Sequence, residues 1–266
     1  MTRRMRLDAE LVRRGLARSR EQAADLISGG LVAVAGQTAA KPATQVGTGA
    51  AITVSDSGTG PGYASRGAYK LAGALAAFTG LVVTDRRCLD AGAAAGGFTD
   101  VLLRAGAAHV TAVDVGQGQL AWRLRTDPRV TAIDRVNVRT LMPEQVAPAP
   151  GVITADLSFI SLALVLPALA ACAAPDADFV LLVKPQFEVG KGRVGAGGVV
   201  RDPALRAAAI ESVAAAALGV GLGVEGVVAS PLPGPSGNVE YFLWLRRGAD
   251  PLDPGAVQRA VAEGPQ

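Results

Sequence analysis

The sequence contains little of what several common kinds of site require. It has one histidine, His109, and two cysteines, Cys88 and Cys172, in 266 residues. A single histidine argues against a histidine dyad and against a His-rich metal site, so we expect no metal. The two cysteines fall in apolar runs that predict a buried strand and a buried helix. They do not suggest a disulfide framework, and the lack of one favours a reducing compartment.

Long uninterrupted apolar segments are also missing. The segment 162–174 contains Pro167 and is too short to span a bilayer, and the segment 207–220 contains Glu211. The basic N-terminus is not followed by the apolar core of a secretory signal. We therefore expect a soluble, cytoplasmic protein. Half of the residues are hydrophobic, enough for a sizeable core, and the net charge of +3 only weakly favours an anionic partner.

The most informative stretch covers residues 88–99 and has the sequence CLDAGAAAGGFT. A short apolar run ends in Asp90, a glycine-rich turn follows, and an amphipathic segment begins at Phe98. This order predicts a strand, a turn and a helix, as in the first turn of a doubly wound sheet, where ligands bind at the carboxyl ends of the strands. Glycine allows a backbone to approach a ligand closely. The three glycines of this turn are Gly92, Gly96 and Gly97.

The spacing of the turn favours a nucleoside ligand without phosphates. Gly92 and Gly96 are four residues apart, which differs from the G-x-G-x-x-G of dinucleotide-binding proteins. The next strand is expected to end in Asp114, which could accept hydrogen bonds from ribose hydroxyls, and the third in Asp134, which could reach the adenine edge. S-adenosylmethionine is the common ligand of this kind, and we expect Asp90 near its methionine amino group. The alternative is a tight turn without a ligand.

Strand-like and helix-like segments alternate through residues 61–250. This alternation predicts an α/β fold with a mostly parallel sheet, and the last two strands allow one antiparallel member. Residues 251–266 form a polar tail with one short helix. The strands are expected near 88–90, 110–114, 130–134, 152–156, 179–183, 224–229 and 240–245, and the helices near 63–78, 98–104, 118–125, 162–171 and 203–217.

The pattern of residues 1–60 predicts a separate small α+β domain, and this range includes the start of a linker expected at 55–62. A helix is expected over 6–14, and a second one after the N-cap candidate Ser19. Short strands are expected over 31–34 and 51–54. The basic residues that we expect to contact RNA here are Arg4, Arg6, Arg13, Arg14, Arg18, Arg20 and Lys41. The alternative is a charged, solvated surface. The order of residues resembles the S4 RNA-binding domain, a family that places two basic helices against an RNA backbone.

Four charged residues stand at strand ends or in loops that a doubly wound sheet brings to one edge. They are Lys70, Asp156, Lys184 and Glu240. Each alone could be a salt bridge or a helix cap, but together, beside a nucleoside-binding loop, they indicate a catalytic site. Arg66, in the segment that leads to Lys70, is a further candidate for RNA contact.

These motifs together resemble the TlyA family of ribosomal RNA 2′-O-methyltransferases, whose catalytic domain is related to the FtsJ-like enzymes. The resemblance covers residues 6–246. It implies a Rossmann-like class I methyltransferase with a seven-stranded sheet, and methyl transfer from S-adenosylmethionine to cytidine 2′-hydroxyls in 16S and 23S rRNA. The implied partners are ribosomal RNA and ribosomal subunits, with no protein partner, and we expect a monomer. Similar proteins have Ser-Thr where this chain has Ala94-Ala95, which leaves backbone N–H groups to bind the methionine carboxylate.

A ribose hydroxyl is a poor nucleophile at neutral pH and needs a base at hydrogen-bond distance. Lys184 is the candidate base and Lys70 the neighbouring cation, because a second ammonium and a dry site both favour a neutral lysine. Glu240 would orient the lysines, and Asp156 would hold the pair near the methyl sulfonium.

Two alternatives come from other classes of protein. The first is an RNA-binding ribosome assembly factor with an inert methyltransferase fold, against which the complete charged set argues. The second is a membrane-active haemolysin, a label that members of the family also carry. No helix in the sequence combines a strong apolar face with a basic one, as membrane-surface binding requires.

Overall fold

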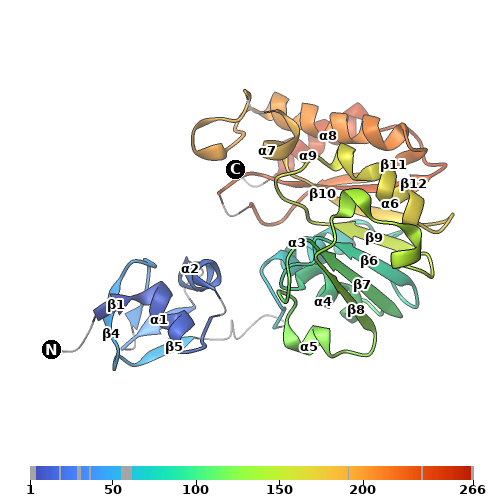
Figure 1. The fold of residues 1–266 in the computed structure, drawn as a ribbon. Coiled ribbons are helices and arrows are strands. Elements are labelled where there is room, and N and C mark those ends of the chain that lie inside the picture. The colour runs from blue at the N-terminus through green and yellow to red at the C-terminus, as the bar shows by residue number, and fades with distance from the viewer. Residues whose placement is uncertain are drawn as a thin grey trace. The chain divides into compact units, whose positions relative to one another are not determined.

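The computed structural model describes residues 4–17, 19–28, 31–35, 37–54, 62–190, 192–234 and 236–264. The chain divides into two compact units, Met1–Gly62 and Tyr63–Gln266, which are described separately (Figure 1). Arg18 and most of the expected linker lie outside the described residues.

The N-terminal unit has two helices and two small sheets. Ser19 precedes the second helix as expected, and its Oγ accepts a hydrogen bond from the backbone N–H of Gln22 at 3.1 Å. The helices are α1 (Leu7–Arg13) and α2 (Arg20–Ser28), and the strands are β1 (Arg4–Arg6), β2 (Val32–Val34), β3 (Gln37–Thr38), β4 (Gln45–Gly47) and β5 (Ile52–Val54). β2 lies between β3 and β5, and β1 pairs with β4. The sheet of β1 and β4, whose strands have three residues each, was not expected from the sequence.

The second unit is built on a seven-stranded sheet with the order β11-β12-β10-β9-β6-β7-β8. β12 runs antiparallel to both of its neighbours, and the other pairs are parallel. This arrangement confirms the predicted fold class. The strands are β6 (Arg87–Ala91), β7 (His109–Asp114), β8 (Val130–Asp134), β9 (Val152–Ala155), β10 (Asp178–Val183), β11 (Leu222–Ala229) and β12 (Tyr241–Arg247).

Helices cover both faces of this sheet (Figure 1). They are α3 (Gly67–Ala77), α4 (Gly97–Arg104), α5 (Trp122–Arg125), α6 (Leu166–Cys172), α7 (Pro185–Glu188), α8 (Pro203–Leu218) and α9 (Pro254–Glu263); short 3₁₀ turns are η1 (Val138–Thr140), η2 (Pro143–Gln145), η3 (Leu162–Leu164) and η4 (Ala196–Gly198). Three predicted helices are shorter than expected, and the one expected near 63–78 begins only at Gly67. The helix over 118–125 begins only at Trp122, since Gly118 has a left-handed φ of +65°. The helix over 162–171 is divided into η3 and α6, where Pro167 lies in the first turn of α6 and lacks an N–H.

The core lies on both faces of the sheet. Along β10, Phe179, Leu181 and Val183 pack into one cluster, whereas Val180 and Leu182 pack into the other. Successive side chains of a strand point to opposite faces, so a strand covered on both sides is a continuous apolar run. Both cysteines are free and buried, as predicted. Burial raises the pKa of the Cys88 thiol to about 12.

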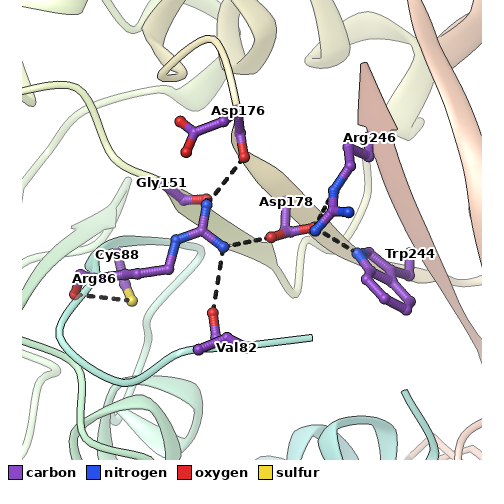
Figure 2. A network of polar contacts seen from close by, with 8 residues as sticks. All are labelled: Val82, Arg86, Cys88, Gly151, Asp176, Asp178, Trp244 and Arg246. Atoms are coloured by element: carbon purple, nitrogen blue, oxygen red, sulfur yellow. Dashed lines mark hydrogen bonds and ion pairs between the residues drawn. The ribbon is translucent and has the colours of Figure 1, made fainter. Parts of the chain in front are cut away.

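A polar network joins several strands at the amino edge of the parallel sheet (Figure 2). Its centre is Asp178, the first residue of β10, whose side chain is fully buried. Arg86 and Arg246 form ion pairs with its two carboxylate oxygens, and Trp244 Nε1 donates to Oδ1 at 2.8 Å. Arg86 also donates to the carbonyl of Gly151, just before β9, at 2.6 Å. The network therefore links the ends of β6, β9, β10 and β12.

Candidate active site

The glycine turn between β6 and α4 lies at the carboxyl edge of the sheet. Gly92 and Gly96 have φ values of +85° and +93°, which glycine adopts without strain. A Cβ at Gly92 would lie 2.5 Å from the backbone oxygen of Asp156, and one at Gly97 would collide with Ser65 Oγ. Close packing within the protein itself therefore already requires glycine at these positions.

The first turn of α4 presents backbone donors. Its N-cap, Gly96, makes no side-chain hydrogen bond, so the first N–H groups of the helix are not capped by that residue. The ring of Phe98 is buried and packs against Phe242, with 6.0 Å between the ring centroids. It is thus the backbone of Phe98, and not its ring, that faces the turn.

Asp90, at the end of β6, is fully buried. Thr99 Oγ1 donates to its Oδ2 at 2.6 Å, and Thr154 Oγ1 to its Oδ1 at 3.4 Å. Burial raises the pKa of Asp90 to about 7, the hydrogen bond from Thr99 acts in the opposite direction, and the charge of Asp156 adds to the rise. The carboxyl group lies behind the glycine turn and ties it to α4.

Asp114 and Asp134 end the neighbouring strands β7 and β8 and are paired in the sheet register. Asp114 accepts hydrogen bonds from the N–H groups of Ala94, at 2.8 Å, and Gly116, at 2.6 Å. It therefore holds the glycine turn from the next strand. Asp134 accepts from Arg125 at 2.9 Å, and this interaction lowers the pKa of its carboxyl group.

The four charged residues form two ion pairs. Lys70 Nζ lies 2.6 Å from Glu240 Oε2, with both side chains buried, and Lys184 Nζ lies 2.5 Å from Asp156 Oδ1. The two ion pairs lie close together. Gly67 stands one turn before Lys70 on α3, and a Cβ built at Gly67 would lie 3.7 Å from Oδ2 of Asp156, the partner of Lys184. We expected Glu240 to orient both lysines. The structure instead gives each lysine a carboxylate of its own.

The loop after β9 adds two residues to which the sequence analysis gave no role. Ser158 Oγ accepts a hydrogen bond from Lys184 Nζ at 3.0 Å. Phe159 has a left-handed φ of +64° and is 92% exposed. Its ring lies 5.2 Å from that of Phe187. The only sequence signal was an aromatic residue in a polar segment directly after a strand-end acid.

Most of the expected RNA-binding arginines of the N-terminal unit are paired with two buried acids. Arg6 and Arg20 pair with Asp8, at 2.8 and 3.0 Å. Arg13 and Arg14 pair with Glu10, and they lower the pKa of this carboxyl group to about 2.

Three further basic candidates differ in their contacts. Arg4 and Lys41 are exposed. Arg66, in the second unit, donates to the backbone oxygen of Pro233 at 3.4 Å. Arg14 also donates to the carbonyls of Ala50 and Thr48, so its position is fixed by the fold. The basic surface is therefore ordered by internal contacts and only partly open to a ligand.

The described residues offer neither a metal site nor a membrane-spanning helix. They contain no group of three or more His, Cys, Asp or Glu side chains placed to hold a metal ion. None of the described helices is long and apolar enough to span a bilayer.

Family comparisons agree with this geometry. The FtsJ-like methyltransferase model matches residues 63–247, and the S4 domain model matches residues 5–52. The chain belongs to the FtsJ-like methyltransferase family. It is 60% identical, over 100% of both sequences, to a Mycobacterium tuberculosis protein named 16S/23S rRNA (cytidine-2′-O)-methyltransferase TlyA. It thus belongs to the TlyA branch of these S4-containing FtsJ-like proteins.

Two other relatives carry a different name. Hemolysin A of Brachyspira hyodysenteriae is 37% identical, over 90% of this chain and 98% of that protein. A solved structure of a protein from Streptococcus thermophilus, described as a hemolysin, has a TM-score of 0.79 at 38% identity and covers 99% of this chain and 96% of that one. The FtsJ-like fold with an S4 domain is therefore shared by proteins of both names.

Proposed function

We propose that this protein transfers a methyl group from S-adenosylmethionine to the 2′-hydroxyl of cytidine in 16S and 23S rRNA. The observation that carries the proposal is the placement of two lysine–carboxylate pairs beside the glycine turn, at one edge of an FtsJ-like sheet. The name of the relative from Mycobacterium tuberculosis supports the same substrate. A ribosomal substrate would place the protein in the cytoplasm.

The residues around the glycine turn fit S-adenosylmethionine. The N–H groups of Gly97 and Phe98, at the start of α4, suit a carboxylate, because a helix N-terminus favours negative charge. Asp114 retains acceptor capacity for ribose hydroxyls, since each carboxylate oxygen has two lone pairs and only one donor to each is observed. Asp90 and Asp134 would support the methionine and adenine ends. When bound, the cofactor supplies a methyl group on a positively charged sulfur.

Lys184 is the group that we assign as base. Its Nζ, held by Asp156 and Ser158, takes the proton of the 2′-hydroxyl when it is in the neutral form, so that the ribose oxygen can accept the methyl group. Lys70, fixed by Glu240, is the neighbouring cation. Positioning supplies much of the remaining rate, because the methyl donor is already activated.

The N-terminal S4 unit would bind the RNA backbone. In the described part of this unit Arg4 and Lys41 are exposed, and Arg6, Arg13 and Arg20 are exposed as well, although each is paired with a carboxylate. Contacts of this kind depend strongly on salt because binding releases counterions from the RNA.

The direct test uses ribosomal subunits from cells that lack this gene. Purified protein and S-adenosylmethionine should place methyl groups on the ribose of defined cytidines, located by mass spectrometry of rRNA fragments. The matched control is Lys184→Ala, which should bind the cofactor and leave the RNA unmodified. Methyl groups on bases, or no transfer by the wild-type protein, would contradict the proposal.

A further inference from the structure

Two loops at the catalytic edge are joined by side-chain contacts along their length. The first loop, residues 156–161, follows β9, and the second, residues 184–188, follows β10 and contains the short helix α7. Lys184 at the start of the second loop contacts Asp156 and Ser158 of the first. Farther along, the rings of Phe159 and Phe187 lie 5.2 Å apart. The two loops therefore form one packed unit.

The far end of this unit is held by Glu188, the last residue of α7. Its Oε2 accepts a hydrogen bond from Ser161 Oγ at 2.5 Å, and its Oε1 accepts one from the backbone N–H of Leu162 at 2.9 Å. Ser161 Oγ in turn accepts from the N–H of Ala163 at 3.2 Å, as the cap of η3. The carboxylate thus fixes the point at which the first loop ends.

The conformation of the first loop depends on such a restraint. Phe159 holds a left-handed φ of +64°, which is unfavourable for an aromatic residue and persists only where the surroundings impose it. Phe159 is 92% exposed as a residue, so burial of its side chain does not hold the backbone in place. Besides the contact of its ring with Phe187, the described restraints lie at the two ends of the loop: the pair of Asp156 with Lys184 and the bonds of Glu188.

We propose that Glu188 is a positioning residue for methyl transfer. By holding Ser161 and Leu162, it keeps the loop in the conformation in which Asp156 and Ser158 meet Lys184. In this role it acts through its hydrogen bonds to Ser161 and Leu162. The proposal rests on the function proposed above, in which Lys184 is the base.

The test compares two substitutions in single-turnover methyl transfer, with the ribosomal substrate and S-adenosylmethionine both saturating. Glu188→Ala removes both hydrogen bonds and should slow the reaction by about tenfold to a hundredfold, as expected for a displaced catalytic group. Glu188→Gln keeps an oxygen for the Leu162 N–H and offers an amide donor to Ser161 Oγ, and it should retain nearly the wild-type rate. Cofactor affinity should be unchanged in both. Glu211→Ala, at an exposed glutamate of α8, is the matched control.

A second measurement follows the loop without requiring activity. Amide hydrogen exchange over residues 156–164 should be faster in Glu188→Ala than in the wild type, and unchanged in Glu188→Gln. Ser161→Ala removes one of the two bonds of Glu188 together with the cap bond from the Ala163 N–H, and it should change rate and exchange in the same direction as Glu188→Ala.

Three results would overturn the proposal. They are wild-type rate and exchange in Glu188→Ala, a Glu188→Gln variant as slow as Glu188→Ala, and a loss of rate in Glu188→Ala that disappears when RNA is saturating. A wild-type protein that methylates no RNA would contradict the proposed function instead, and the exchange measurement would still decide whether Glu188 holds the loop.

Discussion

The two edges of the central sheet use buried charge in different ways. At the amino edge, the carboxylate of Asp178 is surrounded by Arg86, Arg246 and the indole N–H of Trp244 (Figure 2). At the carboxyl edge, Lys70 and Lys184 each face one carboxylate. Arginine stays charged in proteins and makes fixed, forked hydrogen bonds, whereas a lysine can lose its proton. The difference supports a structural role for the first edge and the catalytic role that we propose for the second.

Removal of Lys184 should have the largest effect. Lys184→Ala deletes the proposed base, and we expect methyl transfer to fall by about 10²- to 10⁴-fold, the usual contribution of general base catalysis. Thermal unfolding and calorimetric binding of S-adenosylmethionine should change little. A variant that keeps a tenth of the wild-type single-turnover rate would show that this lysine does not act as the base.

Removal of the carboxylate at the opposite edge should act on stability instead. Asp178→Ala leaves two arginines and an indole without their shared acceptor, and breaking a buried pair of this kind costs about 3–5 kcal/mol. Denaturant unfolding measures the loss, and the activity per folded molecule should remain at the wild-type level. Equal stability of the variant and the wild type would contradict the structural role of this network.

Asp114→Ala should have a smaller effect, confined to the cofactor. A hydrogen bond to a charged group contributes about 1.5–3 kcal/mol, so we expect roughly ten- to hundredfold weaker binding of S-adenosylmethionine by calorimetry. Part of the loss in affinity would come from a displaced glycine turn, because the Asp114 carboxylate also holds this turn by accepting a hydrogen bond from the Ala94 N–H. Unchanged affinity would mean that the cofactor lies elsewhere.

The smallest effect is expected in the N-terminal unit, where arginines again neutralise a buried carboxylate. Arg13 and Arg14 lower the pKa of Glu10 from 4.5 to about 2. Because the pKa of Glu10 is lower in the folded than in the unfolded protein, its ionised form stabilises the fold, and this stabilisation is complete above the unfolded-state pKa. The stabilisation is lost as the pH falls from about 4.5 towards 2. Thermal unfolding followed over this range should show a steeper acid loss in the wild type than in Glu10→Gln. An unfolding temperature that falls equally with pH in the wild type and in Glu10→Gln would contradict the prediction.

Much of the fold could be predicted from the sequence, because apolar runs that alternate with helical periodicity specify a parallel sheet and its order of elements. The strand-end positions of Asp90, Asp114 and Asp134 followed from the same pattern. The pairing of β1 with β4 could not be predicted, because three-residue strands have no detectable period.

The contacts within the site were less predictable than its position. Topology brings Lys70, Asp156, Lys184 and Glu240 to one edge, but the choice of partner for each lysine depends on side-chain geometry that spacing does not encode. The left-handed backbone of Phe159 is likewise imposed by the surrounding loops and is invisible in the sequence.

The most direct test of the central claim is the single-turnover rate of Lys184→Arg at saturating RNA and S-adenosylmethionine. An arginine here can keep an ion pair with Asp156, as arginines do at the amino edge, but it stays protonated and cannot accept the hydroxyl proton. The account predicts a folded protein that binds cofactor and RNA and transfers methyl groups nearly as slowly as Lys184→Ala. A Lys184→Arg enzyme with substantial activity would contradict the assignment of Lys184 as the base.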